Sequence, residues 1–273
     1  MSLTAATPTA STGGILNPVA GAAHFSLTRE PPADDLADTI ERHWIIHWDL
    51  RGRPPFTQEL LPHPCVNLVF EGDRAGVYGI ARVRGRRTIE GRGLAVGTKF
   101  RPGAFQPFAV VPMPALVDRA LSLPEGLGPA AGSQLVAAVA AGEGIAGRIA
   151  AIESFLRDRR PPPDPARELV AVVVAAMLSS PPDVRVDQLA AAHGLSTRSL
   201  QRLFRRYVGV GPKWVLRRYR LHEATERIAA GESRDYGALA LALGYADQSH
   251  FNRDFRALVG SSPARYARAC ESA

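Results

Sequence analysis

GYADQSHFNRDFR, residues 244–256, is the stretch that decides the fold of the C-terminal part of the chain. Gly244 can adopt the left-handed backbone conformation that ends a helix, and Asp247 is of the residue type that caps the next one. Phe251 and Phe255 are four residues apart, so they share one face of a helix, and the polar residues around them face the other way. The stretch therefore predicts a sharp turn followed by a helix with an apolar back and a polar front.

The same pattern occurs about 50 residues earlier in the chain. In both copies a Leu-Ala pair precedes a glycine by the same spacing, and a Phe-Arg pair is followed by Val-Gly and then by a proline. The equivalent positions are Leu189 and Leu239, Gly194 and Gly244, Phe204 and Phe255, Gly209 and Gly260, and Pro212 and Pro263. The repeat predicts two helix-turn-helix units, the arrangement that places its second helix in the major groove of DNA.

Both second helices have the layout of a recognition helix. In the first copy Ser196 is expected to cap a helix that buries Leu200, Leu203 and Phe204. Arg, Gln and Asn side chains on the opposite face can reach base edges and phosphates. The predicted DNA-binding residues are Arg198, Gln201, Arg202 and Arg205 in the first helix, and Gln248, Ser249, His250, Asn252 and Arg253 in the second.

A linker helix from Pro212 to about Ala230 is predicted between the two units, with proline at a permitted first-turn position. At 1.5 Å per residue it spans about 28 Å, close to the roughly 34 Å of one turn of DNA. The two recognition helices are therefore expected to read two half-sites about ten base pairs apart in successive major grooves.

The string 244–256, followed by Gly260 and Pro263, resembles the C-terminal signature of AraC-type (AraC/XylS family) transcription regulators, and the first copy resembles that family's first helix-turn-helix. The resemblance covers about Val184 to Arg268. It implies a seven-helix domain with two recognition helices, and it implies base contacts for the predicted DNA-binding residues. His250 is a departure, since family members vary at this position.

Composition supports a nucleic-acid partner. The formal net charge is +7, and the segment from Asp183 to the end carries +6 of it, which favours binding to polyanions. The two cysteines, Cys65 and Cys270, exclude a disulfide framework and a four-cysteine zinc site and fit a reducing compartment. No apolar stretch approaches the roughly 18 residues of a membrane span. We therefore expect a cytoplasmic protein with no membrane partner.

The expected fold class is α+β, with three parts: a disordered leader at residues 1–21, a β-rich sensing or dimerisation domain with a helical end at 22–180, and the AraC-type double helix-turn-helix domain at 181–273. Short apolar runs separated by turn residues predict strands near residues 44–50, 65–70, 76–83 and 94–100. Apolar residues at helical spacing predict helical segments over residues 133–159 and 166–179.

The N-terminal domain carries weaker signals for a ligand. His43, His47, His63 and Cys65 are metal-ligand types, but they form no tight ligand motif, so neither a metal nor a cofactor is expected. A second group of side chains either lines a pocket for an anionic or aromatic ligand or packs as a sheet edge on the helices that follow, and the packing interpretation is favoured. This group comprises Lys99, Phe100, Arg101, Phe105 and Phe108. Residues 62–70 and 96–108 also resemble an uncharacterised N-terminal domain often joined to AraC-type modules.

These observations predict a sequence-specific DNA-binding transcription regulator that is modulated by a ligand or partner at its N-terminal domain. Its expected partners are double-stranded DNA, a small-molecule effector, a second copy of the chain as a homodimer, and RNA polymerase if it is an activator. The alternative is a ligand-independent DNA binder whose N-terminal domain is a dimerisation platform. An enzyme is not expected, because the sequence has no nucleophile triad, phosphate loop or paired-carboxylate constellation.

Overall fold

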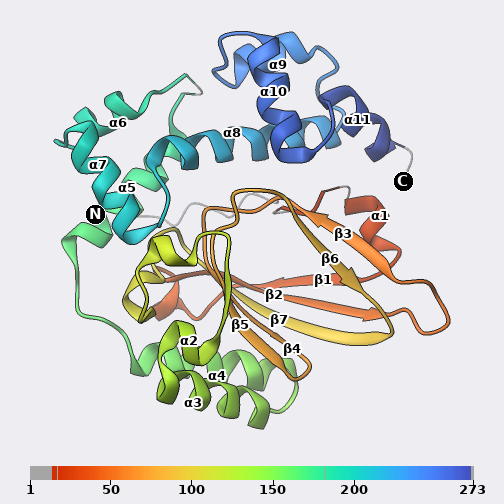
Figure 1. The fold of residues 1–273 in the computed structure, drawn as a ribbon, viewed down its shortest axis with the longest axis vertical. Coiled ribbons are helices and arrows are strands. Elements are labelled where there is room, and N and C mark those ends of the chain that lie inside the picture. Colours follow the sequence, from red (N-terminus) through yellow and green to blue (C-terminus); the bar gives the residue numbers. More distant parts are fainter. Residues whose placement is uncertain (1–13, 17, 182, 272–273) are drawn as a thin grey trace.

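The computed structural model describes residues 14–16, 18–181 and 183–271 (Figure 1). The fold class is α+β, as predicted: a β-rich domain is followed by a helical one. Figure 1 shows the sheet between two groups of helices, with α2, α3 and α4 on one side and α5 to α11 on the other. Within these described residues, no helix combines the length and the apolar character needed to cross a membrane.

The main sheet has six antiparallel strands in the order β1-β2-β7-β4-β5-β8. Its strands are β1 (Ser26–Glu30), β2 (Ile40–Asp49), β4 (Asn67–Glu71), β5 (Arg74–Tyr78), β7 (Arg92–Phe100) and β8 (Ala120–Ser122). A separate two-stranded ribbon pairs β3 (Phe56–Leu60) with β6 (Gly85–Ile89). Strands β2, β4 and β7 match the predicted apolar runs, and β5 overlaps the run at 76–83. The ribbon strands and β1 were missed because charged and polar residues interrupt them, and β8 was missed because it is only three residues long.

One face of the main sheet packs on helices and forms the largest core. The helices are α2 (Leu123–Leu127), α3 (Pro129–Ala141) and α4 (Gly144–Asp158), and short 3-10 turns lie at Asp34–Leu36, Gln106–Phe108 and Met113–Leu116. Ile45, Val96 and Ile152 meet in this core. The segment predicted as helical over 133–159 is two helices, since the chain turns at Gly142, where a side chain would lie 2.7 Å from the backbone of Gly147.

Residues 14–16 and 18–21 of the expected leader are ordered, so the prediction of disorder is wrong for them. Residues 1–13 and 17 of the expected leader lie outside the described residues. Ile15 forms a bridge with Leu60, and α1 (Pro18–Ala22) follows. Leu16 is buried in an apolar cluster with residues of the C-terminal helices. The local sequence does not indicate this order, because Leu16 is buried only when the N-terminal and C-terminal domains are in contact.

The remaining helices are α5 (Pro165–Ser179), α6 (Val186–Ala192), α7 (Thr197–Tyr207), α8 (Pro212–Ala229), α9 (Tyr236–Ala242), α10 (Gln248–Val259) and α11 (Pro263–Glu271). Val170 and Met177 of α5 pack with Leu200 and Phe204 of α7 in one core. The predicted domain boundary after residue 180 would therefore place α5 in a different domain from the helices on which it packs. The packing favours a boundary in the proline-rich segment 159–164, and α5 completes the seven helices that the family resemblance implies.

Candidate nucleic-acid interface

The first helix-turn-helix consists of α6 and α7. Gly194 lies between them with a φ of 67°, the left-handed conformation that the sequence predicts. The hydroxyl of Ser196 accepts a hydrogen bond from the amide of Ser199 at 3.1 Å, which caps the start of α7. Leu200 and Phe204 are fully buried. With its apolar side in the core, α7 presents its polar side to solvent.

The second unit, α9 and α10, repeats this construction. Gly244 has a φ of 72°, and the carboxylate of Asp247 accepts a hydrogen bond from an amide in the first turn of α10 at 2.7 Å. Phe251 and Phe255 are fully buried. Gly260, with a φ of 82°, ends α10 in the left-handed conformation. In both units, local residue choice accounts for the turn between the helices and for the start of the second helix.

Helix α8 joins the two units, as predicted, and runs for 18 residues or about 27 Å at 1.5 Å per residue. Val215 and Leu216 near its start belong to the core of the first unit, whereas Leu221 and Ile228 belong to the core of the second. Figure 1 shows α8 spanning the distance between α7 and α10. The spacing of the two recognition helices is therefore set by one helix that is buried in both cores.

The structure exposes eight of the nine residues predicted to bind DNA. They are Arg198, Gln201, Arg202 and Arg205 on α7, and Gln248, Ser249, His250 and Arg253 on α10. Asn252 is the exception: it is half-buried, and its Oδ1 atom is buried without a hydrogen-bond partner in the part of the chain that the structure describes. The expectation of an exposed Asn252 is wrong, because the residue lies at the edge of the buried stripe that begins at Phe251.

Asp254 is an element of this site that sequence reasoning missed. It is buried on α10 and forms an ion pair with Arg217 of α8. Its Oδ2 atom also lies 3.7 Å from Nε2 of His250, whose ring packs edge-on against Tyr245 at 5.2 Å. A buried carboxylate that loses its cation is strongly destabilising, so this pair ties α10 to the linker helix. The i,i+4 spacing of His250 and Asp254 was the available signal.

The aromatic group proposed from sequence as a pocket lining is part of the core instead. Phe100, Phe105 and Phe108 pack on one another, with ring centroids of Phe100 5.0 and 6.0 Å from the other two, in the core between the sheet and its helices. Arg101 donates to the carbonyl of Ala37 at 2.6 Å. The favoured packing interpretation is therefore correct for the three phenylalanines, although β7 lies inside the sheet and not at its edge. Lys99 differs from them, because it lines the larger of the two cavities described below.

The candidate metal ligands of the N-terminal domain do not come together. His43 is buried and its Nε2 lies 3.1 Å from Glu153, whereas His47 is exposed. His63 stacks on His222 of α8. Burial raises the pKa of the Cys65 thiol to about 11, so this thiol is protonated at neutral pH. Among the residues that the structure describes, no three His, Cys, Asp or Glu side chains are grouped as a metal site would require.

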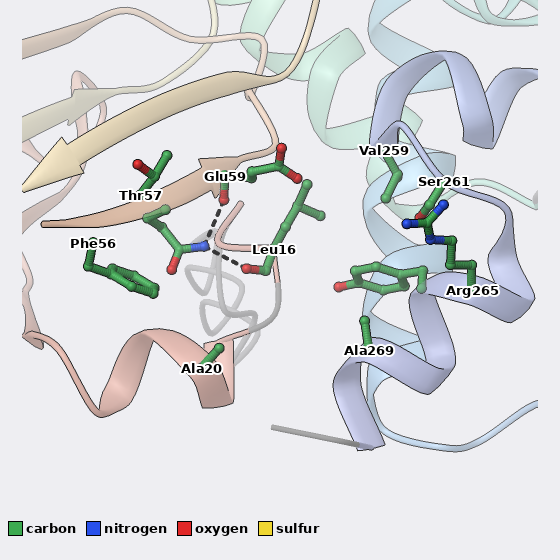
Figure 2. Close-up of a pocket in the computed structure, with 11 residues that line it drawn as sticks. Leu16, Ala20, Phe56, Thr57, Glu59, Val259, Ser261, Arg265 and Ala269 are labelled. Atoms are coloured by element: carbon green, nitrogen blue, oxygen red, sulfur yellow. Dashed lines mark hydrogen bonds between the residues drawn. The ribbon is translucent and has the colours of Figure 1, made fainter. Parts of the chain in front are cut away.

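Two cavities adjoin the β3–β6 ribbon. The larger, about 420 Å³, lies inside the N-terminal domain between the main sheet and the ribbon. The smaller, about 260 Å³, lies between β3 and α11 and is shown in Figure 2. At its edge the amide of Gln58 donates to the carbonyls of Leu16 and Glu59, at 2.6 and 2.9 Å. The ribbon therefore has a cavity on one side and the C-terminal helices on the other.

Comparison with known proteins adds a match for each of two parts of the chain. Residues 189–269 match a model described as a helix-turn-helix domain, and residues 28–122 match a domain of unknown function (DUF6597). An uncharacterized HTH-type transcriptional regulator of Haemophilus influenzae is 26% identical over 102 residues, which cover 37% of this chain and 34% of that protein. The chain thus matches about a third of that relative's length.

Solved structures with similarity to the chain include an AraC-type regulator from Chromobacterium violaceum, at 25% identity and a TM-score of 0.32, covering 38% of this chain and 88% of that one. The match to ToxT from Vibrio cholerae covers 92% of this chain and 100% of the ToxT chain, at 10% identity and a TM-score of 0.39. The match over residues 189–269, together with the duplicated helix-turn-helix and its signature string, identifies the C-terminal part of the chain as an AraC-type helix-turn-helix domain, and the match over residues 28–122 identifies the part before it as a domain of the uncharacterised DUF6597 type.

Proposed function

We propose that this protein is a sequence-specific transcription regulator that binds double-stranded DNA, each chain reading two half-sites about ten base pairs apart through α7 and α10. The observation that carries the proposal is the pair of capped helices with buried backs and exposed Arg and Gln fronts, held at a set spacing by α8. An apolar back that is fully packed leaves the polar front as the side available for the groove.

Within this proposal the exposed residues have different roles. Arg202 and Arg253 lie at comparable places near the middle of their helices and are exposed, so they are the proposed base-reading arginines. Arg205, near the end of α7, is proposed to contact phosphate, which positions the helix but carries no sequence information. His250 is held by Tyr245 and Asp254, which favours a supporting contact over base recognition.

We further propose that a small-molecule effector at the N-terminal domain modulates DNA binding. Two observations support this: the domain contains a cavity of about 420 Å³, and the wall of that cavity contacts α8. The competing function is a ligand-independent DNA binder that uses the N-terminal domain to form a homodimer. RNA polymerase is a further proposed partner if the protein activates transcription.

The DNA-binding proposal is tested by selecting bound sequences from a random pool with the full chain. The wild type is expected to select two short half-sites about ten base pairs apart. Arg202→Ala and Arg253→Ala should each relax base preference at a different half-site, at a cost of about 1–3 kcal/mol. Arg51→Ala, at an exposed arginine in the turn after β2, is the matched control and should bind as the wild type does. Equal weakening on all sequences, with a smaller salt dependence, would overturn the base-reading roles.

A further inference from the structure

We infer that the cavity of the N-terminal domain binds a small organic monoanion, a carboxylate with an apolar body, and that Arg42 and Lys99 hold its charged group. The binding site is argued from the cavity alone. Its consequence for regulation rests on the proposed function, because it requires that the C-terminal domain bind DNA.

The floor of the cavity is a flat apolar surface built by cross-strand pairing. Trp44 and Trp48 of β2 lie directly opposite Gly97 and Gly93 of β7. A Cβ atom at Gly97 would lie 2.0 Å from the ring of Trp44, and one at Gly93 would lie 2.1 Å from the ring of Trp48. Both indoles therefore lie across the backbone of β7, where any residue larger than glycine would displace them. Such a floor favours an apolar, planar or extended ligand body.

One end of the same surface is positively charged. Arg42 of β2 pairs in register with Lys99 of β7, which pairs in turn with Asn67 of β4. Lys99 Nζ lies 2.9 Å and Arg42 Nη1 lies 3.5 Å from the single carboxylate of Glu41. Two cations thus share one anion. Arg29 also lines the cavity, and burial together with the charge of Arg42 lowers the pKa of its guanidinium.

This arrangement selects among ligand classes. Lys99 is buried, so an anion that reaches it gains an interaction weakly screened by water. The cations Arg29, Arg42 and Lys99 outnumber Glu41 at this end, which suits an anionic group, and the apolar surface beside them suits a single carboxylate on an apolar body better than a polyphosphate. The lining beside it is apolar at Trp44, Ile46 and Trp48, which suits the apolar body of the ligand. A volume of about 420 Å³ fits a molecule of one or two rings or a medium-length chain.

The wall of the cavity continues directly into the C-terminal domain. Leu61 lines the cavity and also belongs to the apolar cluster that contains Leu221 of α8. The next residue, Pro62, accepts a hydrogen bond from Nε2 of His222 at 3.1 Å, and the His63 ring stacks on His222 with centroids 3.9 Å apart. A ligand that binds one arrangement of this wall better than another will shift how α8 is held, and with it the two recognition helices.

The test measures carboxylate binding to the full-length protein without DNA. The probes are benzoate, indole-3-acetate and octanoate, each against its neutral amide, with thermal unfolding and tryptophan fluorescence as readouts. At least one carboxylate should raise the unfolding temperature and change the fluorescence, and its amide should not. Lys99→Met combined with Arg42→Gln should weaken that binding at least tenfold, and Arg51→Gln should leave it unchanged.

Since the double variant removes a buried charge, its folding is checked by circular dichroism. Trp44→Leu, which keeps the cations and removes one ring of the floor, provides a second variant that should also weaken binding. The inference is overturned if none of the three carboxylates binds at millimolar concentration, if amides bind equally, or if both variants bind as the wild type does. Any of these results leaves the DNA-binding proposal intact, because DNA binding is measured separately with no carboxylate present. If a carboxylate binds but DNA affinity does not change, the binding site is supported and its proposed effect on DNA binding is overturned.

Discussion

Arg84 of the N-terminal domain donates a hydrogen bond to the carbonyl of Val259, 3.2 Å away, at the last residue of the second recognition helix. The same guanidinium nitrogen lies 2.9 Å from both carboxylate oxygens of Glu59 on β3. Gly260 makes the approach possible, since a Cβ atom there would lie 2.4 Å from the guanidinium. A cation at the C-terminal end of a helix satisfies a free carbonyl and interacts favourably with the helix dipole. Arg84 therefore joins the ribbon to α10.

Arg84→Ala is expected to lower the free energy of unfolding by about 1 kcal/mol, the contribution of one charge-assisted hydrogen bond at a partly exposed helix end. Amide hydrogen exchange in the last turn of α10 should accelerate as well. Arg86→Ala is the matched control, because Arg86 is more exposed and lies 3.9 Å from the same Glu59. If both variants behave alike, the contact with Val259 has no energetic weight.

Gly194→Ala is expected to destabilise the protein by about 1 kcal/mol. The cost comes from the backbone alone, since φ is 67° and a Cβ atom at this position would meet nothing within 4 Å. Gly85 provides the comparison, because it lies in β6 outside the left-handed region and a Cβ atom there would meet only Leu60, at an ordinary 3.7 Å. Gly85→Ala should therefore be neutral or slightly stabilising in denaturant unfolding. Equal effects of the two substitutions would contradict a left-handed turn at Gly194.

Phe204→Ala and Phe255→Ala should each cost about 3–5 kcal/mol of stability, as expected for a large side chain removed from a packed core. The two residues are fully buried and belong to different cores, one in each helix-turn-helix unit. DNA affinity should fall because less of the protein is folded, whereas the preferred sequence of the folded fraction stays the same. A changed sequence preference in either variant would contradict a purely structural role.

Stability should decrease on mild acidification because of His222. Burial lowers the pKa of this histidine from 6.5 to about 3, so the unfolded chain binds a proton more readily than the folded one. The contribution of neutral His222 to the free energy of unfolding is fully present above pH 6.5 and is lost as the pH falls toward 3. Over this range the free energy of unfolding changes with a slope that approaches about 1.4 kcal/mol per pH unit. His222→Gln should show a flatter profile between pH 6.5 and 4 in denaturant unfolding. Identical slopes for variant and wild type would assign the acid sensitivity to other groups.

Much of the DNA-binding domain could be predicted because its signals are local. Gly194 and Gly244 end helices through their own backbone freedom, Ser196 and Asp247 cap helices through hydrogen bonds within three residues, and apolar spacing defines the buried face. The same reasoning failed for Asn252 and Asp254, whose surroundings depend on neighbouring elements. Arg217, the partner of Asp254, comes from a different helix, which no local pattern indicates.

The sequence by itself determined two helix-turn-helix units, their polar fronts and the helix between them, since each depends on residues within a few turns of one another. Only the tertiary structure decided that α5 packs with the first unit, that Leu16 is buried between the domains, and that two tryptophans of β2 lie on glycines of β7 to floor a cavity. These features depend on strand pairing and domain contact between residues far apart in the chain. Their energy is gained only when the whole fold is assembled, so no single segment carries their signal.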